Sequence, residues 1–214
     1  GGLLIFFSFI FILLNNLTFF FSFFLLLIFL LGTLSDLKLT SSARTRLILQ
    51  LIITLIYIYL SDLRLSNTGI HFLDRANNFY YFNYFFVCFC LLILINGSNF
   101  IDGLNGLCLG YYLLIILFLF KNDFNNIILT DKSDLIILFL SLLIILFFNY
   151  LNKIFIGDNG SYILSAIFGI NLIQVYNENN FISPFYIILL LWYPCFELLF
   201  SILRKYNFKK LSMT

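Results

Sequence analysis

Three polar stretches in an otherwise apolar chain carry the residue types that bind phosphates, sugars and metal ions. They are GTLSDLKLTSSARTRL at 32–47, NGSNFIDGLNGL at 96–107 and KIFIGDNGSY at 153–162. Each combines carboxylates or amides with glycines and adjoins a long apolar run. Polar groups close to a bilayer are costly, so they tend to serve a function. These three stretches are therefore the candidate site.

The stretch at 96–107 carries a polar side chain at every third position: Asn96, Asn99, Asp102 and Asn105. If the stretch is helical, these side chains form one stripe on the helix surface. Three amides and one carboxylate at a helix end can hydrogen-bond a nucleobase, a ribose or a metal-bound phosphate. The glycines between them permit close approach of the backbone. The alternative is a polar turn in which Asn and Asp cap a helix.

The stretch at 153–162 places a single carboxylate, Asp158, between Gly157 and an Asn-Gly-Ser turn. The flanking glycines indicate a tight backbone that aims this carboxylate. Mg²⁺ prefers hard oxygen ligands and takes one or two carboxylates together with substrate phosphates. Asp158 is therefore a candidate Mg²⁺ ligand. The alternative is that Asp158 or Ser161 caps the following helix.

In the stretch at 32–47, Asp36 follows Ser35 and precedes Lys38, Arg44 and Arg46. A carboxylate beside several cations suits a phosphorylated substrate that is handled with a metal ion. The alternative is that these cations flank a membrane helix and set its orientation, which we favour for the two arginines.

The composition determines which elements must position these residues. Of the 214 residues, 62% are hydrophobic and 10% are charged, against about 25% charged in soluble domains. The chain has too few polar side chains to cover a soluble globule, which excludes intrinsic disorder, a coiled coil and a typical cytosolic enzyme. The formal net charge of +2 is too weak for a nucleic-acid partner. A polytopic protein of the lipid bilayer remains.

Eight apolar segments are expected to be helices, because backbone groups in lipid must be hydrogen-bonded within their own segment. They cover roughly 3–14, 17–34, 43–60, 79–95, 107–120, 135–151, 161–176 and 182–203. The sequence therefore predicts an all-α transmembrane helix bundle of about eight spans, with residues 1–214 forming a single integral membrane domain. The first and fifth segments are short for a span.

The connectors between these segments alternate between the two sides of the membrane. One set, 35–46, 96–106, 152–160 and 204–214, holds eight Lys and Arg residues, and the other set holds four. Because cytoplasmic loops carry the excess of positive charge, the three polar stretches are predicted to face the cytoplasm.

The remaining reactive residue types point to structural roles. His71 is the only histidine, so it cannot form a zinc or catalytic cluster by itself. Glu197 follows Pro194 inside the last apolar segment and is expected to satisfy a partner within the bundle rather than face the site. The four cysteines are expected to be buried structural thiols; they are Cys88, Cys90, Cys108 and Cys195.

At the three stretches the chain resembles the polyprenyl-phosphate N-acetylhexosamine-1-phosphate transferases, which form glycosyltransferase family 4. The matching patterns are a Gly-Gly pair, part of an acidic pair, the two long polar motifs and the last core helix. They lie at Gly1-Gly2, Ser35-Asp36, Asn96–Leu107, Lys153–Ser161 and 194–205. Their order, spacing and side of the membrane agree with the family over essentially the whole chain.

The resemblance implies transfer of an N-acetylhexosamine 1-phosphate from a UDP-sugar to undecaprenyl phosphate, with release of UMP. This would be the first membrane step in the synthesis of a cell-envelope polysaccharide. It implies a multi-pass protein of the bacterial inner membrane whose active site faces the cytoplasm. Mg²⁺ is the implied cofactor, with Mn²⁺ as a substitute, and the resemblance allows a homodimer.

The resemblance also implies roles for individual residues. The catalytic residues would be Asp36, Asp102 and Asp158, and Asp158 and Asp36 would hold the metal. Nucleotide, sugar and phosphate would be bound by Lys38, Asn96, Asn99, Asn105, Lys153, Gly160 and Ser161.

The chain departs from the family at Ser35, where relatives usually carry an acidic residue. A complete family member is expected to have about ten or eleven spans, so we expect this chain to be truncated at both ends. A catalytically impaired or truncated relative is therefore one alternative. A membrane transporter is another, although a transport path needs polar residues near the midplane.

Overall fold

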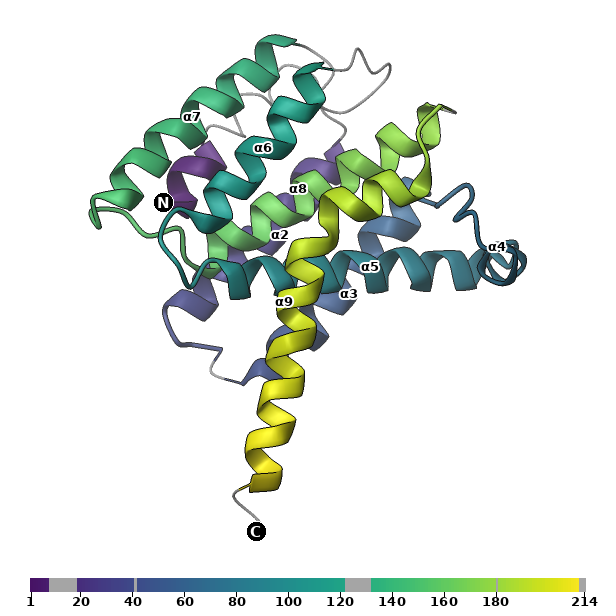
Figure 1. Cartoon of the computed structure of the whole chain (residues 1–214), viewed down its shortest axis with the longest axis horizontal. Helices are drawn as coiled ribbons and strands as arrows, with labels where there is room; N and C mark the ends of the chain where they lie inside the picture. The colour runs from purple at the N-terminus through teal and green to yellow at the C-terminus, as the bar shows by residue number, and fades with distance from the viewer. Residues whose placement is uncertain (8–18, 41, 122–131, 180, 212–214) are drawn as a thin grey trace.

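The fold is a bundle of helices, as the sequence predicts. A computed structural model describes residues 1–7, 19–40, 42–121, 132–179 and 181–211, and these contain helices and no β-strand (Figure 1). Residues 2–7 are helical. The labelled helices are α2 (Phe19–Asp36), α3 (Ala43–Ser61), α4 (His71–Asn77), α5 (Tyr80–Ile101), α6 (Leu107–Lys121), α7 (Lys132–Tyr150), α8 (Gly157–Glu178) and α9 (Pro184–Leu211).

Among the described residues, five helices are long and apolar enough to cross a membrane: α2, α3, α5, α7 and α9. The expected segment 107–120 coincides with a shorter apolar helix, α6. The segment 161–176 lies within α8, whose two ends are polar and lower its overall hydropathy. Most of the segment 3–14, and most of the connector 121–134, lie outside the described residues.

Helix α8 forms the centre of the bundle. Every residue from Gly160 to Ile173 is buried, and α2 and α5 both pack on this helix. Small side chains, including Ser165 and Ala166, let neighbouring helices approach. A Cβ atom on Gly169 would lie 2.7 Å from Cδ2 of Leu91 in α5. The two ends of α8 therefore emerge at opposite ends of a tightly packed core.

A proline inside α9 is accommodated by its neighbours. Pro194 has no backbone N–H, so the carbonyl of Leu190, four residues earlier, loses its helical donor. The hydroxyl of Tyr111 in α6 donates to this carbonyl oxygen at 2.5 Å. Gly97 of α5 packs against the Pro194 backbone, where a side chain would clash. The freed carbonyl is thus satisfied within the protein, as membrane burial requires.

Three helices extend well beyond the predicted apolar segments, and one of them is α9, which ends at Leu211 rather than at 203. Helix α5 continues past residue 95 to Ile101, and α8 begins at Gly157 rather than 161. The extra turn of α5 is held in place because the hydroxyls of Ser98 and Tyr112 are hydrogen-bonded at 2.5 Å. The polar residues at 96–101 and 157–161 therefore lie on helix ends rather than in loops.

Candidate active site

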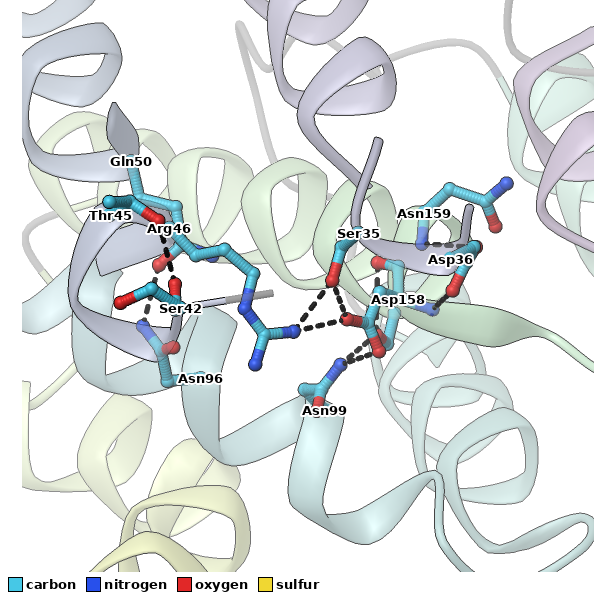
Figure 2. A network of polar contacts seen from close by, with 11 residues as sticks. Ser35, Asp36, Ser42, Thr45, Arg46, Gln50, Asn96, Asn99, Asp158 and Asn159 are labelled. Atoms are coloured by element: carbon cyan, nitrogen blue, oxygen red, sulfur yellow. Dashed lines mark hydrogen bonds and ion pairs between the residues drawn. The ribbon is translucent and has the colours of Figure 1, made fainter. Parts of the chain in front are cut away.

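Side chains from three other helices converge on the carboxylate of Asp158 in the first turn of α8 (Figure 2). The Asn99 amide of α5 donates to Oδ1 at 2.6 Å. The Arg46 guanidinium of α3 forms an ion pair with Oδ2 at 2.7 Å, and the Ser35 hydroxyl of α2 donates to the same oxygen. Arg46 also donates to the Ser35 hydroxyl at 2.6 Å. One carboxylate thus joins α2, α3, α5 and α8.

Asp36, the last residue of α2, caps the start of α8. Its Oδ1 accepts the backbone N–H of Asp158 at 2.9 Å, and its Oδ2 accepts that of Asn159 at 3.4 Å. The helix's own N-cap residue, Ile156, makes no side-chain capping bond. A carboxylate in this position satisfies two free N–H groups and complements the helix dipole. Asp158 is therefore not the cap, and its side chain faces the polar cluster.

Glycines permit this close contact between α2 and α8. Gly157 has φ +74°, a conformation that favours glycine. A Cβ atom at Gly157 would lie 2.7 Å from Oδ2 of Asp36. Gly160 is buried, and a Cβ atom there would meet the side chain of Ile156 and the backbone of Gly2. Gly160, which the resemblance assigns to substrate binding, thus allows close packing at the start of α8 in this structure.

Asp102 adds a third carboxylate to the same region. It follows the last residue of α5, is half-buried and accepts a hydrogen bond from the backbone N–H of Gly157. The pKa of Asp102 is raised to about 7, mainly by burial; the hydrogen bond from Gly157 opposes the shift, and the charges of Asp158 and Asp36 contribute to it. The charges of Asp36 and Asp158 thus act on Asp102, so the three carboxylates lie in one region of the structure.

The continuous stripe expected at 96–107 does not form, because the helix ends at Ile101. Asn96 donates to Oε1 of Gln50 at 2.9 Å and to its own helix at Leu92 O. Beyond the helix end, Asn105 donates to Asn152. Of the three amides in the motif, Asn99 is the one that bonds Asp158. Nucleotide or sugar contacts by Asn96 and Asn105 stay predictions.

The other predicted contacts surround this cluster. Ser161 donates to the backbone carbonyl of Asp158 at 3.2 Å, and Asn99 donates to the Ser161 hydroxyl at 3.5 Å. Lys38 and Lys153 have exposed side chains. Lys38 lies in the turn after α2, with φ +58°. Both lysines lie in segments that adjoin the cluster, which is compatible with the expected phosphate contacts.

Sequence reasoning set Arg46 aside as a topology-setting cation, yet it lies at the centre of the cluster. The available signal was Gln50, a polar residue one helical turn further along the same face of α3. Gln50 is fully buried and bonds Asn96. Two polar residues on one face of an apolar helix indicate a buried polar contact.

The donor set fits a divalent cation that is shared with a substrate. Among the described residues, no group of three His, Cys, Asp or Glu side chains is placed to hold a metal alone. Mg²⁺ needs only one or two carboxylates when phosphates and water complete its shell. Asp158 offers hard oxygen ligands, and nearby carboxylates favour a cation. A metal ion that binds Oδ2 of Asp158 must displace the guanidinium of Arg46 from this oxygen. Both Asp36 oxygens accept backbone N–H groups, so its metal role stays a prediction.

Comparison with known families shows to which family the chain belongs. The sequence profile of glycosyl transferase family 4 matches residues 18–176, which is most of the chain. The matched region includes Asp36, Arg46, Asn99, Asp102 and Asp158. No curated protein matches the chain. The family match confirms the expectation drawn from the sequence motifs, and the chain belongs to glycosyl transferase family 4.

Proposed function

We propose that this protein transfers N-acetylhexosamine 1-phosphate from a UDP-sugar to undecaprenyl phosphate and releases UMP. The observation that carries the proposal is the group of Asp36, Asp102 and Asp158 at one end of the bundle, with Arg46 bound to Asp158. Family membership supports the general class of reaction, a glycosyl-phosphate transfer by a membrane protein.

In the proposed reaction, an oxygen of the lipid phosphate attacks the phosphorus that carries the sugar. The bond between this phosphorus and the oxygen of UMP breaks, and UMP leaves with that oxygen. A new diphosphate linkage joins the lipid and the sugar. Such a transfer requires mostly positioning of the reactants and neutralisation of charge. Mg²⁺ bound at Asp158 would offset negative charge on the diphosphate.

The residues of the cluster suit this task. The guanidinium of Arg46 matches the geometry of phosphate oxygens, and it is partly exposed, with 28% of its side-chain surface accessible. Asn99 orients Asp158 through a hydrogen bond. Asp36 holds the first turn of α8, and the exposed Lys38 and Lys153 attract anionic substrates. With a pKa of about 7, Asp102 can be protonated or ionised near neutral pH, and it can hydrogen-bond the nucleotide or sugar in both protonation states.

The position of the cluster also suits a lipid substrate. The phosphate of a polyprenyl phosphate lies at the membrane surface, whereas its chain lies among the helices. The nucleotide sugar would arrive from the aqueous solution at the Gly157 end of α8. We propose that this side is the cytoplasm of a bacterial inner membrane, because the connectors at this end carry most of the cations.

A direct assay tests this function. The purified protein in detergent is given UDP-N-acetylglucosamine and undecaprenyl phosphate in the presence of Mg²⁺, and UMP is measured. We expect UMP to form only when the lipid acceptor and a divalent cation are both present. Formation of UMP without the lipid would indicate simple hydrolysis and contradict the proposal. A panel of UDP-amino sugars then identifies the donor.

One observation favours a second candidate, a catalytically impaired relative. Ser35 stands where relatives usually carry a carboxylate, and Arg46 holds Asp158 in an ion pair. An impaired relative would bind the nucleotide sugar without forming UMP. Equilibrium binding of the UDP-sugar together with the UMP assay separates this candidate from the active enzyme.

A further inference from the structure

A polar cavity lies at the end of the bundle opposite Asp158. Its volume is about 540 Å³, and it is lined by residues from the ends of α3, α4 and α8, the start of α5 and the connector after α3. Helix α8 has 22 residues, so its two ends are roughly 33 Å apart. The cavity is therefore separate from the candidate active site. Its volume lies in the range of about 300–1,000 Å³ that is typical of small-molecule sites.

The wall of this cavity is fixed by side-chain amides. Asn83 of α5 accepts the backbone N–H of Leu65 at 3.0 Å and donates to its carbonyl at 2.9 Å. Asn177 of α8 accepts the N–H of Ser66 at 3.1 Å and donates to the carbonyl of Arg64 at 2.6 Å. The connector between α3 and α4 is thus held by two helices, and the cavity is a preformed feature of the fold.

Two side-chain amides in the cavity lining have buried polar atoms without a hydrogen-bond partner. Asn77 is 8% exposed, and both its Oδ1 and its Nδ2 are buried without a hydrogen bond. The Oε1 atom of Gln174 is also buried and unpartnered. An unsatisfied buried polar group costs about 1–3 kcal/mol, so such groups are uncommon without a purpose. These atoms are covered in the present side-chain positions, so a ligand in the cavity that offers both donors and acceptors would satisfy them once the side chains rotate toward it.

The charges of the cavity limit the class of ligand. Asp62 is paired with Arg64 at 2.5 Å, and its carboxylate also accepts the hydroxyl of Tyr80 at 2.9 Å. These contacts lower the pKa of Asp62 to about 2, with hydrogen bonds from Tyr84, Arg64 and Tyr80 as the main causes. Glu178 adds a further carboxylate to the lining. The net charge of the lining is thus negative, which disfavours a phosphate or another anion.

We propose that this cavity binds an uncharged saccharide unit. Hydroxyl and acetamido groups supply the donors and acceptors that Asn77 and Gln174 lack, and a neutral sugar avoids repulsion by Glu178. This site is additional to any binding of the nucleotide sugar near Asp158, and it does not depend on the proposed transfer reaction.

Binding of methyl N-acetyl-β-glucosaminide to the purified full chain in detergent tests the proposal. We expect saturable binding in saturation-transfer NMR, with a dissociation constant in the millimolar range. The double variant Asn77→Ala/Gln174→Ala should weaken binding at least tenfold. The matched control Asp158→Asn, at the other end of α8, should leave it unchanged.

A second variant keeps the test valid if the double variant fails to fold. Asn78 is an exposed residue of the cavity lining, so Asn78→Trp should fill the cavity without removing a buried amide. Thermal unfolding checks that each variant is folded. Absence of saturable binding to the wild type, or unchanged binding to folded Asn78→Trp, would overturn the proposal. Loss of binding in Asp158→Asn would also overturn it, because the sugar would then occupy the candidate active site.

Discussion

Oδ1 of Asp36 accepts the backbone N–H of Asp158 at 2.9 Å, so the last residue of α2 holds the first turn of α8. The two carboxylates therefore have different roles. Asp36 satisfies the free N–H groups of the helix start, and Asp158 is left to turn its side chain toward Arg46 and Asn99. The arrangement brings two acidic residues that are distant in sequence into one site, with a different contact for each.

Replacing Asp36 should therefore affect stability as well as activity. Asp36→Ala removes the acceptor for two backbone N–H groups, and loss of a helix cap costs about 0.5–2 kcal/mol. We expect a lower midpoint of thermal unfolding in detergent and strongly reduced UMP formation. Asp36→Asn should recover part of the stability, because the amide oxygen still accepts one N–H. An unchanged unfolding midpoint in Asp36→Ala would contradict the capping role.

Arg46 is predicted to be essential, unlike its neighbour Arg44. Arg46→Gln removes the ion pair with Asp158 and the guanidinium that we propose to bind a substrate phosphate. UMP formation should fall more than tenfold, with partial recovery in Arg46→Lys, which keeps the charge but loses the planar group. Arg44→Gln changes an exposed residue of the same helix and serves as the matched control. Equal loss in the two glutamine variants would indicate a general effect of charge on membrane insertion.

Ser35→Asp tests whether the absence of a carboxylate at position 35 limits the activity of the protein. The new side chain would lie between Asp158 and Arg46, where the arginine offsets part of the repulsion. We expect UMP formation to be retained or increased, and its dependence on Mg²⁺ concentration to shift toward lower concentrations. Complete loss of UMP formation would mean that the end of α2 is built differently from the family, and it would contradict the roles assigned to Asp36.

The raised pKa of Asp102 predicts a dependence of stability on pH. The folded protein holds this proton up to a pKa of about 7, whereas an unfolded Asp releases it near 3.9. The folded state thus binds more protons between these values, so the contribution of Asp102 to stability falls as pH rises through this window. Asp102→Asn should unfold at a higher temperature than the wild type at pH 8, and the difference should shrink toward pH 4. The comparison is made by thermal unfolding in detergent with a metal chelator. A difference that is constant with pH would refute the assignment.

Tyr111 is predicted to stabilise α9 at its proline. Tyr111→Phe leaves the carbonyl of Leu190 without a donor, which costs about 1–3 kcal/mol for a buried group. Thermal unfolding should show this loss, whereas Tyr150→Phe, at an exposed position at the end of α7, should have little effect. Equal stability of the two variants would mean that the carbonyl finds another partner.

The sequence predicts the fold class and the region of the site because both depend on composition and on local motifs. Long apolar runs require helices in lipid, and the glycine-flanked Asp158 stands out against them. The ends of α5 and α8 were not predictable in this way, since they depend on contacts such as Ser98 with Tyr112. The capping of α8 by Asp36 also depends on tertiary packing between residues more than a hundred positions apart.

The role of Arg46 shows the same limit. A cation beside an apolar helix is usually a membrane-flanking residue, and the one local feature that distinguishes Arg46 from Arg44 is Gln50, one helical turn further along the same face. The difference arises because Arg46 of α3 points toward Asp158 of α8 (Figure 2), whereas Arg44 is exposed. The hydrogen bond between Asn99 and Asp158 likewise depends on the packing of α5 on α8, which local sequence does not show.

The most direct test of the proposed function is UMP formation by Asp158→Asn, compared with the matched variant Asp74→Asn in α4. The substitution keeps the size of the side chain but removes the charge that attracts a hard cation. We predict that UMP formation falls by orders of magnitude in Asp158→Asn, with partial rescue by excess Mg²⁺ and little change in folded yield, whereas Asp74→Asn stays near the wild-type rate. Near-normal, Mg²⁺-dependent UMP release by Asp158→Asn would contradict the account, because the metal and the reaction would then lie elsewhere.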